Sequence, residues 1–136
     1  PLVIHAGTEP KSDQYLCDPY RLCRAKKMDR ILNTFPGLRV CVPHLGFGEV
    51  HEYRRLIESH DNLWLDTAMV LTDYFPMETG IDLSAYRIDR IMYGSDFPNI
   101  PYAWDRELLW LKDAGLPQKA LDQILYKNAV EFFDLP

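Results

Sequence analysis

The sequence predicts an α/β fold with a parallel sheet, because short apolar runs alternate with segments of helical spacing. The runs are continuous, which is typical of strands that are covered on both faces. Alternating strands and helices favour right-handed βα units. Four such units in 136 residues are close to half of a (β/α)8 barrel, which needs about 250 residues. Two architectures therefore fit: an open doubly wound sheet, or part of a (β/α)8 barrel.

Four buried strands and four following helices are predicted along the chain. The strands are Leu2–Ile4, Arg39–Val42, Leu63–Leu65 and Arg90–Tyr93, and the helical stripes span 20–35, 50–57, 104–111 and 120–133. We expect the first helix to begin at Asp18-Pro19, a capping residue followed by proline at the first helical position. A short helix is expected around 83–86. No linker divides the chain, so residues 1–136 are interpreted as one unit.

Composition excludes several classes of protein. Fifteen Lys and Arg against twenty Asp and Glu give a net charge of −5, and no basic block occurs. This argues against nucleic acid or an anionic membrane as the main partner. No apolar run approaches the roughly 18 residues of a membrane span, and no secretory signal precedes the first strand. Three cysteines without a CxxC pair favour a reducing compartment, so we expect a cytoplasmic protein.

Each predicted strand ends in an ionisable side chain. These residues are His5, His44, Asp66 and Asp96, in the segments VIHAG, VPHLG, LWLDT and YGSDFP. In parallel α/β folds the active site lies beyond the carboxyl ends of the strands. Imidazole and carboxylate are ligands that suit divalent transition metals. A single such residue is more often structural, but four at equivalent positions predict a metal or acid–base site.

Other catalytic patterns are absent from the sequence. It contains no GxGxxG, GxxxxGK[ST] or GxSxG motif. The His51-Glu52 pair begins like a zincin helix, but Arg55 stands where the second histidine is needed. His51 and His60 are interpreted as solvated helix residues. Cys17 and Cys23 lack a strand-end histidine partner at a nucleophile spacing, so a thiol nucleophile is not expected.

Together the segments VIHAG, LRVCVPHLG, NLWLDTA, RIMYGSDFP and KNAVEFF resemble the C-terminal half of the metal-dependent amidohydrolases. The resemblance is to the amidohydrolase 2 branch, which includes aminocarboxymuconate-semialdehyde decarboxylase and related lactone hydrolases. It covers essentially the whole chain, and GSDFP with an upstream HLG is its most specific part. The resemblance implies that the chain supplies strands five to eight of a (β/α)8 barrel.

The resemblance also implies roles for the residues at the strand ends. His5 would bind a divalent metal, usually zinc, and Asp96 would bind the metal and accept a proton from its water. His44 would lie beside that water or the substrate and assist proton transfer. Asp66 falls where the family has no constant ligand and is interpreted as a supporting residue. The family's His-x-His pair of the first strand does not occur here. Because the chain opens at Pro1 within a strand, we expect it to be cut from a longer protein.

Two classes of function remain open from the sequence. The first is a metal-dependent enzyme, either a hydrolase of an ester, lactone or amide, or a decarboxylase of the same fold. The second is a non-catalytic half-barrel that assembles with itself, with the missing N-terminal half or with another partner, because open sheet edges recruit other chains. The aromatic and proline residues that follow strand ends suit a small cyclic or aromatic carboxylic acid, although they could equally pack the loops. They are Tyr74, Phe75, Phe97, Pro98 and Trp104.

Overall fold

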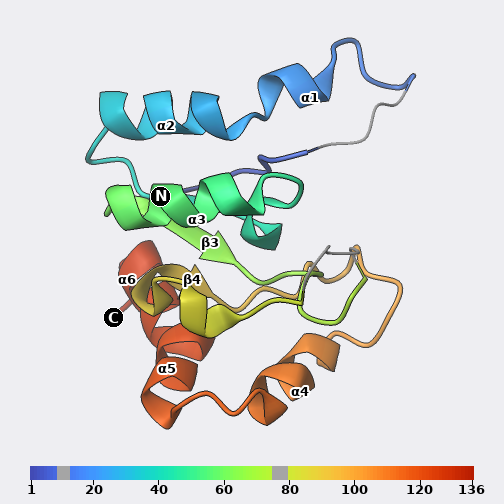
Figure 1. Ribbon diagram of the computed structural model, residues 1–136, viewed down its shortest axis with the longest axis vertical. Coiled ribbons are helices and arrows are strands. Elements are labelled where there is room, and N and C mark those ends of the chain that lie inside the picture. The colour runs from blue at the N-terminus through green and yellow to red at the C-terminus, as the bar shows by residue number, and fades with distance from the viewer. Residues whose placement is uncertain (9–12, 75–79) are drawn as a thin grey trace.

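The computed structural model describes residues 1–8, 13–74 and 80–136, and its centre is a four-stranded parallel sheet (Figure 1). The strands are β1 (Leu2–Val3), β2 (Val40–Val42), β3 (Leu63–Asp66) and β4 (Ile91–Met92). Each strand pairs with its neighbour in the sequence, and the order β1-β2-β3-β4 never reverses. Doubly wound sheets contain a point where the order reverses. The observed order is the one expected for consecutive strands of a barrel.

Helices follow the strands and pack around the sheet. They are α1 (Pro19–Leu22), α2 (Ala25–Thr34), α3 (Val50–Ser59), α4 (Arg106–Asp113), α5 (Gln118–Asp122) and α6 (Asn128–Phe133). A π-helical turn, Gln123–Lys127, joins α5 to α6, and short 3-10 turns occupy His44–Gly46, Leu83–Ala85 and Ile88–Arg90. In Figure 1, α1 and α2 lie at one end of the molecule and α4 and α5 at the other. The short helix expected around 83–86 is a 3-10 turn at Leu83–Ala85.

The first predicted helix is in fact two helices. Pro19 occupies the first turn of α1 as expected, but the Asp18 side chain makes no capping hydrogen bond to that turn. Arg24 is extended, with φ −67° and ψ 139°. The Glu49 carboxylate accepts hydrogen bonds from Arg24 Nε (2.7 Å) and from the Ala25 N–H (2.8 Å). Glu49 thus satisfies an amide at the start of α2 from a distant loop, and this contact stabilises the break.

Three of the four strands form the buried centre of the core. Val40, Val42, Leu63, Leu65 and Ile91 are fully buried, as the continuous apolar runs predict. The prediction of a buried strand at Leu2–Ile4 is wrong in one respect. β1 forms at this place, at one edge of the sheet, but Leu2, Val3 and Ile4 are 39%, 51% and 43% exposed.

The helices α3 and α6 cover the sheet with the predicted apolar faces. Tyr53 and Ile57 of α3 are buried, as are Ile124, Asn128 and Phe132 along the closing helical segment. Trp104 lies before α4 rather than in it and is 56% exposed. None of the helices in the described ranges is long and apolar enough to cross a membrane.

Candidate functional site

The four predicted site residues follow the carboxyl ends of the four strands. His5 comes two residues after β1, His44 two residues after β2, Asp66 ends β3, and Asp96 lies four residues after β4. All four strands are parallel, so these residues share one edge of the sheet. The rings of His5 and His44 lie together, with centroids 5.5 Å apart and planes inclined at 56°. The structure therefore brings the two predicted histidines into direct proximity.

His44 is held in one orientation by its surroundings. Its ring is largely buried, and Nδ1 lies 2.9 Å from the backbone carbonyl oxygen of Ala68. A carbonyl can only accept, so this contact requires Nδ1 to carry the proton. Nε2 of the neutral ring is then free of its proton and can accept a proton or a ligand. The tautomer of His44 is thus set by the loop that follows β3.

Asp66 connects the ends of β2 and β3. Its Oδ1 accepts hydrogen bonds from the N–H of His44 (3.1 Å) and from the N–H of Ala68 (3.0 Å). Burial raises the pKa of the Asp66 carboxyl; these two N–H donors oppose the rise, and the nearby Asp96 carboxylate adds to it. The contacts are of the kind that a supporting residue makes, and the role itself stays a prediction.

The space for the Asp66 side chain depends on Gly94, which follows β4. A Cβ on Gly94 would lie 2.9 Å from both Cγ and Oδ1 of Asp66, closer than real Cβ contacts allow. The Gly94 N–H donates to Thr67 Oγ1 at 3.4 Å. The close approach of β3 and the segment after β4 therefore requires a residue without a side chain at position 94.

The backbone at the strand ends adopts conformations that L-residues rarely take. His44, Met69 and Asp96 have φ values of 58°, 64° and 59°. This left-handed region costs roughly 1–2 kcal/mol for a residue with a Cβ, and such positions cluster at functional sites. The three residues follow β2, β3 and β4 in turn. These three strained positions therefore lie at the strand ends that the sequence predicts as the site, and the other described non-glycine residues with positive φ are Leu45, Asp73 and Asp134, the last of which ends α6.

A complete metal site is not formed by the residues that the structure describes. Within 1–8, 13–74 and 80–136, no three His, Cys, Asp or Glu side chains lie close enough together to hold an ion. The predicted ligands from this chain are two, His5 and Asp96. Imidazole nitrogen and carboxylate oxygen form a donor set that suits zinc. These residues therefore fit part of a metal site, and their ligand roles stay predictions.

The two helical histidines differ from each other. His51 is exposed on α3, as predicted. His60 is not simply solvated, because its Nε2 lies 2.8 Å from Oδ1 of Asp29 and its side chain is only 11% exposed. This contact joins the end of α3 to α2. His60 therefore makes a structural contact, and it precedes β3, at the opposite end of that strand from Asp66.

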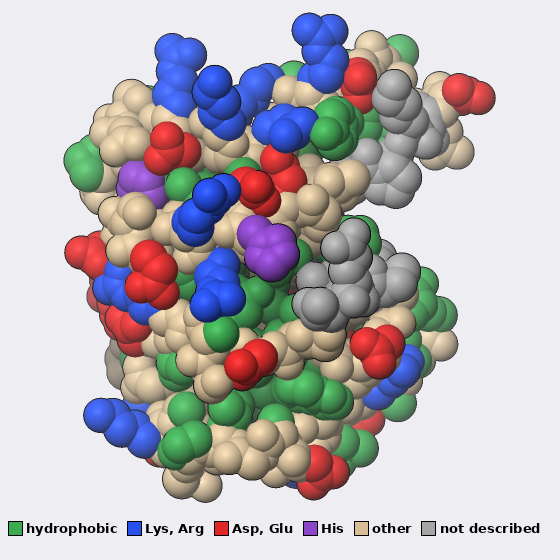
Figure 2. Space-filling view, viewed as in Figure 1, with side chains coloured by type: hydrophobic (Ala, Val, Ile, Leu, Met, Phe, Trp, Pro, Cys, Tyr) green, Lys and Arg blue, Asp and Glu red, His purple; other side chains and the backbone are tan. Residues whose placement is uncertain are grey.

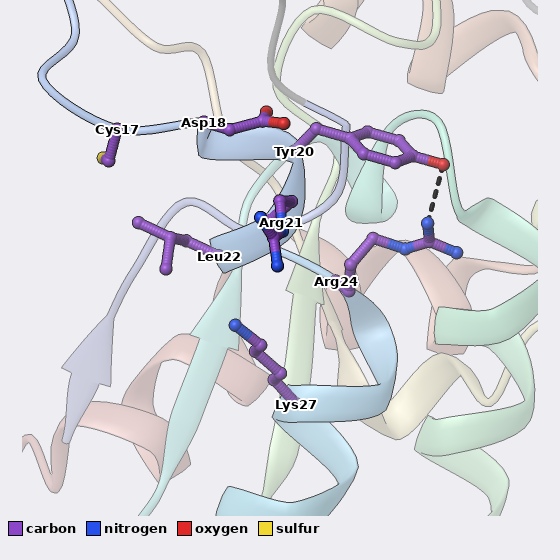
Figure 3. Close-up of a pocket in the computed structure, with 7 residues that line it drawn as sticks. All are labelled: Cys17, Asp18, Tyr20, Arg21, Leu22, Arg24 and Lys27. Carbon is purple, nitrogen blue, oxygen red and sulfur yellow. Dashed lines mark hydrogen bonds between the residues drawn. The ribbon is translucent and has the colours of Figure 1, made fainter.

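A pocket of about 580 Å³ lies where α1 meets α2 (Figure 3). Its lining residues are Cys17, Asp18, Tyr20, Arg21, Leu22, Arg24 and Lys27. Arg21 and Lys27 extend toward one another in this pocket, and Arg24 donates to the Tyr20 hydroxyl at 2.6 Å. The Gly7 N–H, two residues after His5, donates to the Cys23 carbonyl at 2.7 Å. The pocket thus adjoins the loop that follows β1.

Figure 2 shows Lys and Arg side chains gathered at the end of the molecule where α1 and α2 lie.

The aromatic residues that could either line the site or pack the loops are exposed where they are described. Phe97 and Trp104 are 67% and 56% exposed, and Tyr74 is 42% exposed with its ring 5.3 Å from that of Tyr102. Phe75 lies outside the described residues. These side chains follow β3 and β4, at the same edge of the sheet as His44.

Among the described helices, two buried polar residues were not predicted from the sequence. Glu107 of α4 is 1% exposed, and Asn128 of α6 is fully buried. They could have been found in the sequence as polar residues at helical spacing from buried apolar residues. Glu107 lies four residues before the buried Leu111, and Asn128 lies four residues from both Ile124 and Phe132.

Comparisons with solved structures identify the fold. An uncharacterized TIM-barrel protein from Bordetella bronchiseptica is 20% identical, with a TM-score of 0.72 over 98% of this chain and 45% of that chain. A zinc-bound amidohydrolase from Burkholderia multivorans is 14% identical (TM-score 0.62, 82% and 49%). The 5-carboxyvanillate decarboxylase of Sphingomonas paucimobilis is 17% identical (TM-score 0.61, 98% and 49%). The chain therefore has the fold of a TIM-barrel segment.

The sequence also matches a family. A sequence model described as Amidohydrolase matches residues 1–135, and the chain belongs to this amidohydrolase family, as the strand-end motifs predict. No curated protein matches the chain. The chain spans about half the length of the solved structures that it resembles.

Proposed function

We propose that the chain contributes strands five to eight of a (β/α)8 barrel, and half of the active site, to a metal-dependent hydrolase of the amidohydrolase family. The observation that carries the proposal is the contact of His5 with His44, whose rings lie 5.5 Å apart at the shared carboxyl edge of the strands. Packing alone gives no reason for two imidazoles at this edge. The uninterrupted order β1 to β4 supports the assignment to successive barrel strands.

Each residue at the strand ends has a separate role in the proposed reaction. Bound at His5 and Asp96, a zinc ion would lower the pKa of a water molecule to about 7 and polarise the substrate carbonyl. Asp96 accepts the proton as the water oxygen bonds to the carbonyl carbon, and returns it to the leaving oxygen or nitrogen as that bond breaks. His44, protonated at Nδ1, presents Nε2 to the water and orients it. Asp66 holds the backbone of His44 in place.

The substrate that we propose is a small carboxylic acid, cyclic or aromatic. The pocket between α1 and α2 carries Arg21 and Lys27, which suit a carboxylate group. Glu49 and Tyr20 hold the Arg24 side chain in place. Its binding to a substrate carboxylate would therefore cost little side-chain entropy. The exposed rings of Phe97 and Trp104 offer flat surfaces after β4. A carboxylated substrate also suits a second candidate, a decarboxylase, which one structural neighbour is.

Hydrolysis and decarboxylation can be distinguished by isotopic labelling of the product. Hydrolysis places an oxygen from water in the product, so ¹⁸O-labelled water yields labelled carboxylate. Decarboxylation breaks a carbon–carbon bond, releases CO₂, and leaves an electron pair on carbon that takes a proton from solvent. The product in D₂O then carries carbon-bound deuterium. A panel of lactones, esters and aromatic carboxylic acids, followed by mass spectrometry, assigns the reaction class.

The proposal is tested with the Asp96→Asn and His5→Ala variants of the active protein. We expect Asp96→Asn to lose turnover by at least 10²-fold, roughly the contribution of a positioned acid–base group, and to keep the far-UV circular dichroism of the wild type. His5→Ala should lower the bound zinc measured by mass spectrometry. The matched controls, Asp113→Asn and His51→Ala, alter exposed residues of the same types. Full turnover in Asp96→Asn, or unchanged zinc in His5→Ala, would favour the non-catalytic half-barrel.

A further inference from the structure

Glu107 is a buried carboxyl group that the proposed chemistry does not use. It lies in the first turn of α4, and only 1% of its surface is exposed. Its Oε1 faces the N–H of Leu71 at 3.3 Å and the hydroxyl of Thr72 at 3.4 Å. Among the described residues, no hydrogen-bond partner reaches Oε2. A buried carboxyl with an unpaired oxygen is costly, so its presence calls for a physical reason.

The residues that Glu107 holds belong to the loop 67–72, which follows β3. This loop is buried although it has no regular secondary structure: Ala68, Met69, Val70 and Leu71 are at most 6% exposed. Buried amides outside helices and sheets need acceptors from elsewhere. Glu107 provides one acceptor at the far end of the loop, and Asp66 provides another through the Ala68 N–H at its start.

The same loop sets the orientation of His44. The Ala68 carbonyl accepts the hydrogen bond from His44 Nδ1, and one residue later Met69 has a φ of 64°. The loop therefore turns sharply between the carbonyl that faces His44 and the amide that faces Glu107. Arg106, the neighbour of Glu107 on α4, donates to the Thr72 carbonyl at 2.8 Å. The start of α4 thus contacts the loop through two successive side chains.

We propose that Glu107 is a positioning residue, which anchors the loop 67–72 so that the Ala68 carbonyl keeps the His44 ring in its Nδ1–H form. Glu107 does not touch His44; it acts through four residues of buried backbone. Only the importance of this tautomer for turnover rests on the proposed function; the anchoring itself does not.

The test measures the tautomer of His44 directly, in the full chain, from the imidazole ¹⁵N chemical shifts of neutral histidine. We expect the Nδ1–H form to predominate in the wild type. Glu107→Leu removes the acceptor, and the ratio of Nδ1–H to Nε2–H should fall by about threefold to tenfold, the factor that one hydrogen bond corresponds to. Glu107→Gln keeps an oxygen at the Oε1 position and should retain the wild-type ratio. Glu107→Asp keeps the charge but withdraws the oxygen, so an intermediate fall is expected.

The control is Leu111→Val, which alters a fully buried residue of the same helix. It should destabilise α4 without changing the tautomer ratio. A wild-type ratio in folded Glu107→Leu or Glu107→Asp would overturn the proposal, as would an equal fall in Leu111→Val. If Glu107→Leu does not fold, Glu107→Asp and Glu107→Gln decide the question between them. Loss of turnover in a His44 variant is measured separately, so the proposed function can fail while the anchoring role stands.

Discussion

The backbone N–H of His44, just beyond β2, donates a hydrogen bond to the carboxylate of Asp66 at the end of β3, over 3.1 Å. The same carboxylate oxygen accepts a hydrogen bond from the N–H of Ala68, and the Ala68 carbonyl accepts a hydrogen bond from Nδ1–H of His44. Asp66 therefore holds the backbone of His44, and Ala68, two residues further along the chain, holds its ring. A change in the position of Asp66 must move both contacts together.

Gly94→Ala should displace the Asp66 carboxylate. The added Cβ would lie 2.9 Å from Cγ of Asp66, and overpacking of this kind costs about 1–3 kcal/mol. Urea unfolding should show this loss. The matched control is Gly37→Ala, where no atom lies within 4 Å of the added Cβ. Equal stability of the two variants would contradict the close approach.

Glu107→Gln should change how the stability of the protein depends on pH. Burial raises the pKa of Glu107 from 4.5 to about 7, against the favourable contacts of the Leu71 and Met69 amides and the Thr72 hydroxyl. The folded protein then binds more protons than the unfolded chain between these values, so Glu107 lowers stability as pH rises from 4.5 to about 7. The full effect above pH 7 is about 3 kcal/mol, since one pKa unit is about 1.4 kcal/mol.

The measurement is the difference in unfolding free energy between Glu107→Gln and the wild type, followed from pH 4 to 8. The difference should rise in favour of the variant across this window and level off above it. The surrounding groups Tyr93, Tyr102, Asp105 and Arg106 are present in both proteins, and burial raises the pKa of both tyrosines further above the window. A difference that is flat with pH would contradict the raised pKa of Glu107.

Asn128→Ala should destabilise the protein strongly. The Asn128 side chain donates to the carbonyl oxygens of Ile88 (2.7 Å) and Ile91 (2.6 Å). Its removal leaves two buried carbonyls without these donors and a cavity beside them, a loss of about 2–4 kcal/mol. Asn33→Ala, on the exposed side of α2, is the control and should change stability by about 0.5 kcal/mol or less. Chemical denaturation compares the two.

The cysteines should differ sharply in reactivity toward a thiol reagent. Cys17 is exposed, whereas Cys41 is buried in β2, where burial raises the pKa of its thiol. Since the thiolate is the reactive form, Cys41 should react only when the protein unfolds. Quantitative labelling of native protein, with Cys41→Ser and Cys17→Ser as a matched pair, identifies which thiol reacts. Rapid labelling of Cys41 in native protein would contradict its burial.

Much of the fold was predictable because local patterns agree with tertiary burial. Val40–Val42 and Leu63–Leu65 are apolar runs that become central strands, and GSDFP follows the last strand as the resemblance implies. The break at Arg24 was not predictable, because the apolar stripe continues through it and the acceptor, Glu49, lies 25 residues away. The exposure of β1 was not predictable either, because Leu2–Ile4 is a continuous apolar run of the same kind as those that form the buried strands.

The candidate site was predictable only in its residue types. Parallel strands bring their carboxyl ends together, so His5, His44, Asp66 and Asp96 could be placed on one edge. The contacts of the Ala68 carbonyl and the Glu107 carboxyl could not be predicted. Every residue has a backbone carbonyl, so the sequence does not distinguish the one that contacts His44, and a helical glutamate usually faces solvent. Their contacts arise from the irregular loop 67–72, whose path no periodicity describes.

The hydrogen bonds of Asn128 have a consequence for the order of folding. β4 is only two residues long. The Asn128 side chain, 37 residues further along the chain, donates to the Ile91 carbonyl of this strand. The Ile124 carbonyl accepts a hydrogen bond from the Tyr93 N–H, just after the strand, at 2.8 Å. We therefore expect β4 to pair stably with β3 only once residues 124–128 are in place. Before that, β3 presents an unpaired sheet edge, a surface that can pair with another chain.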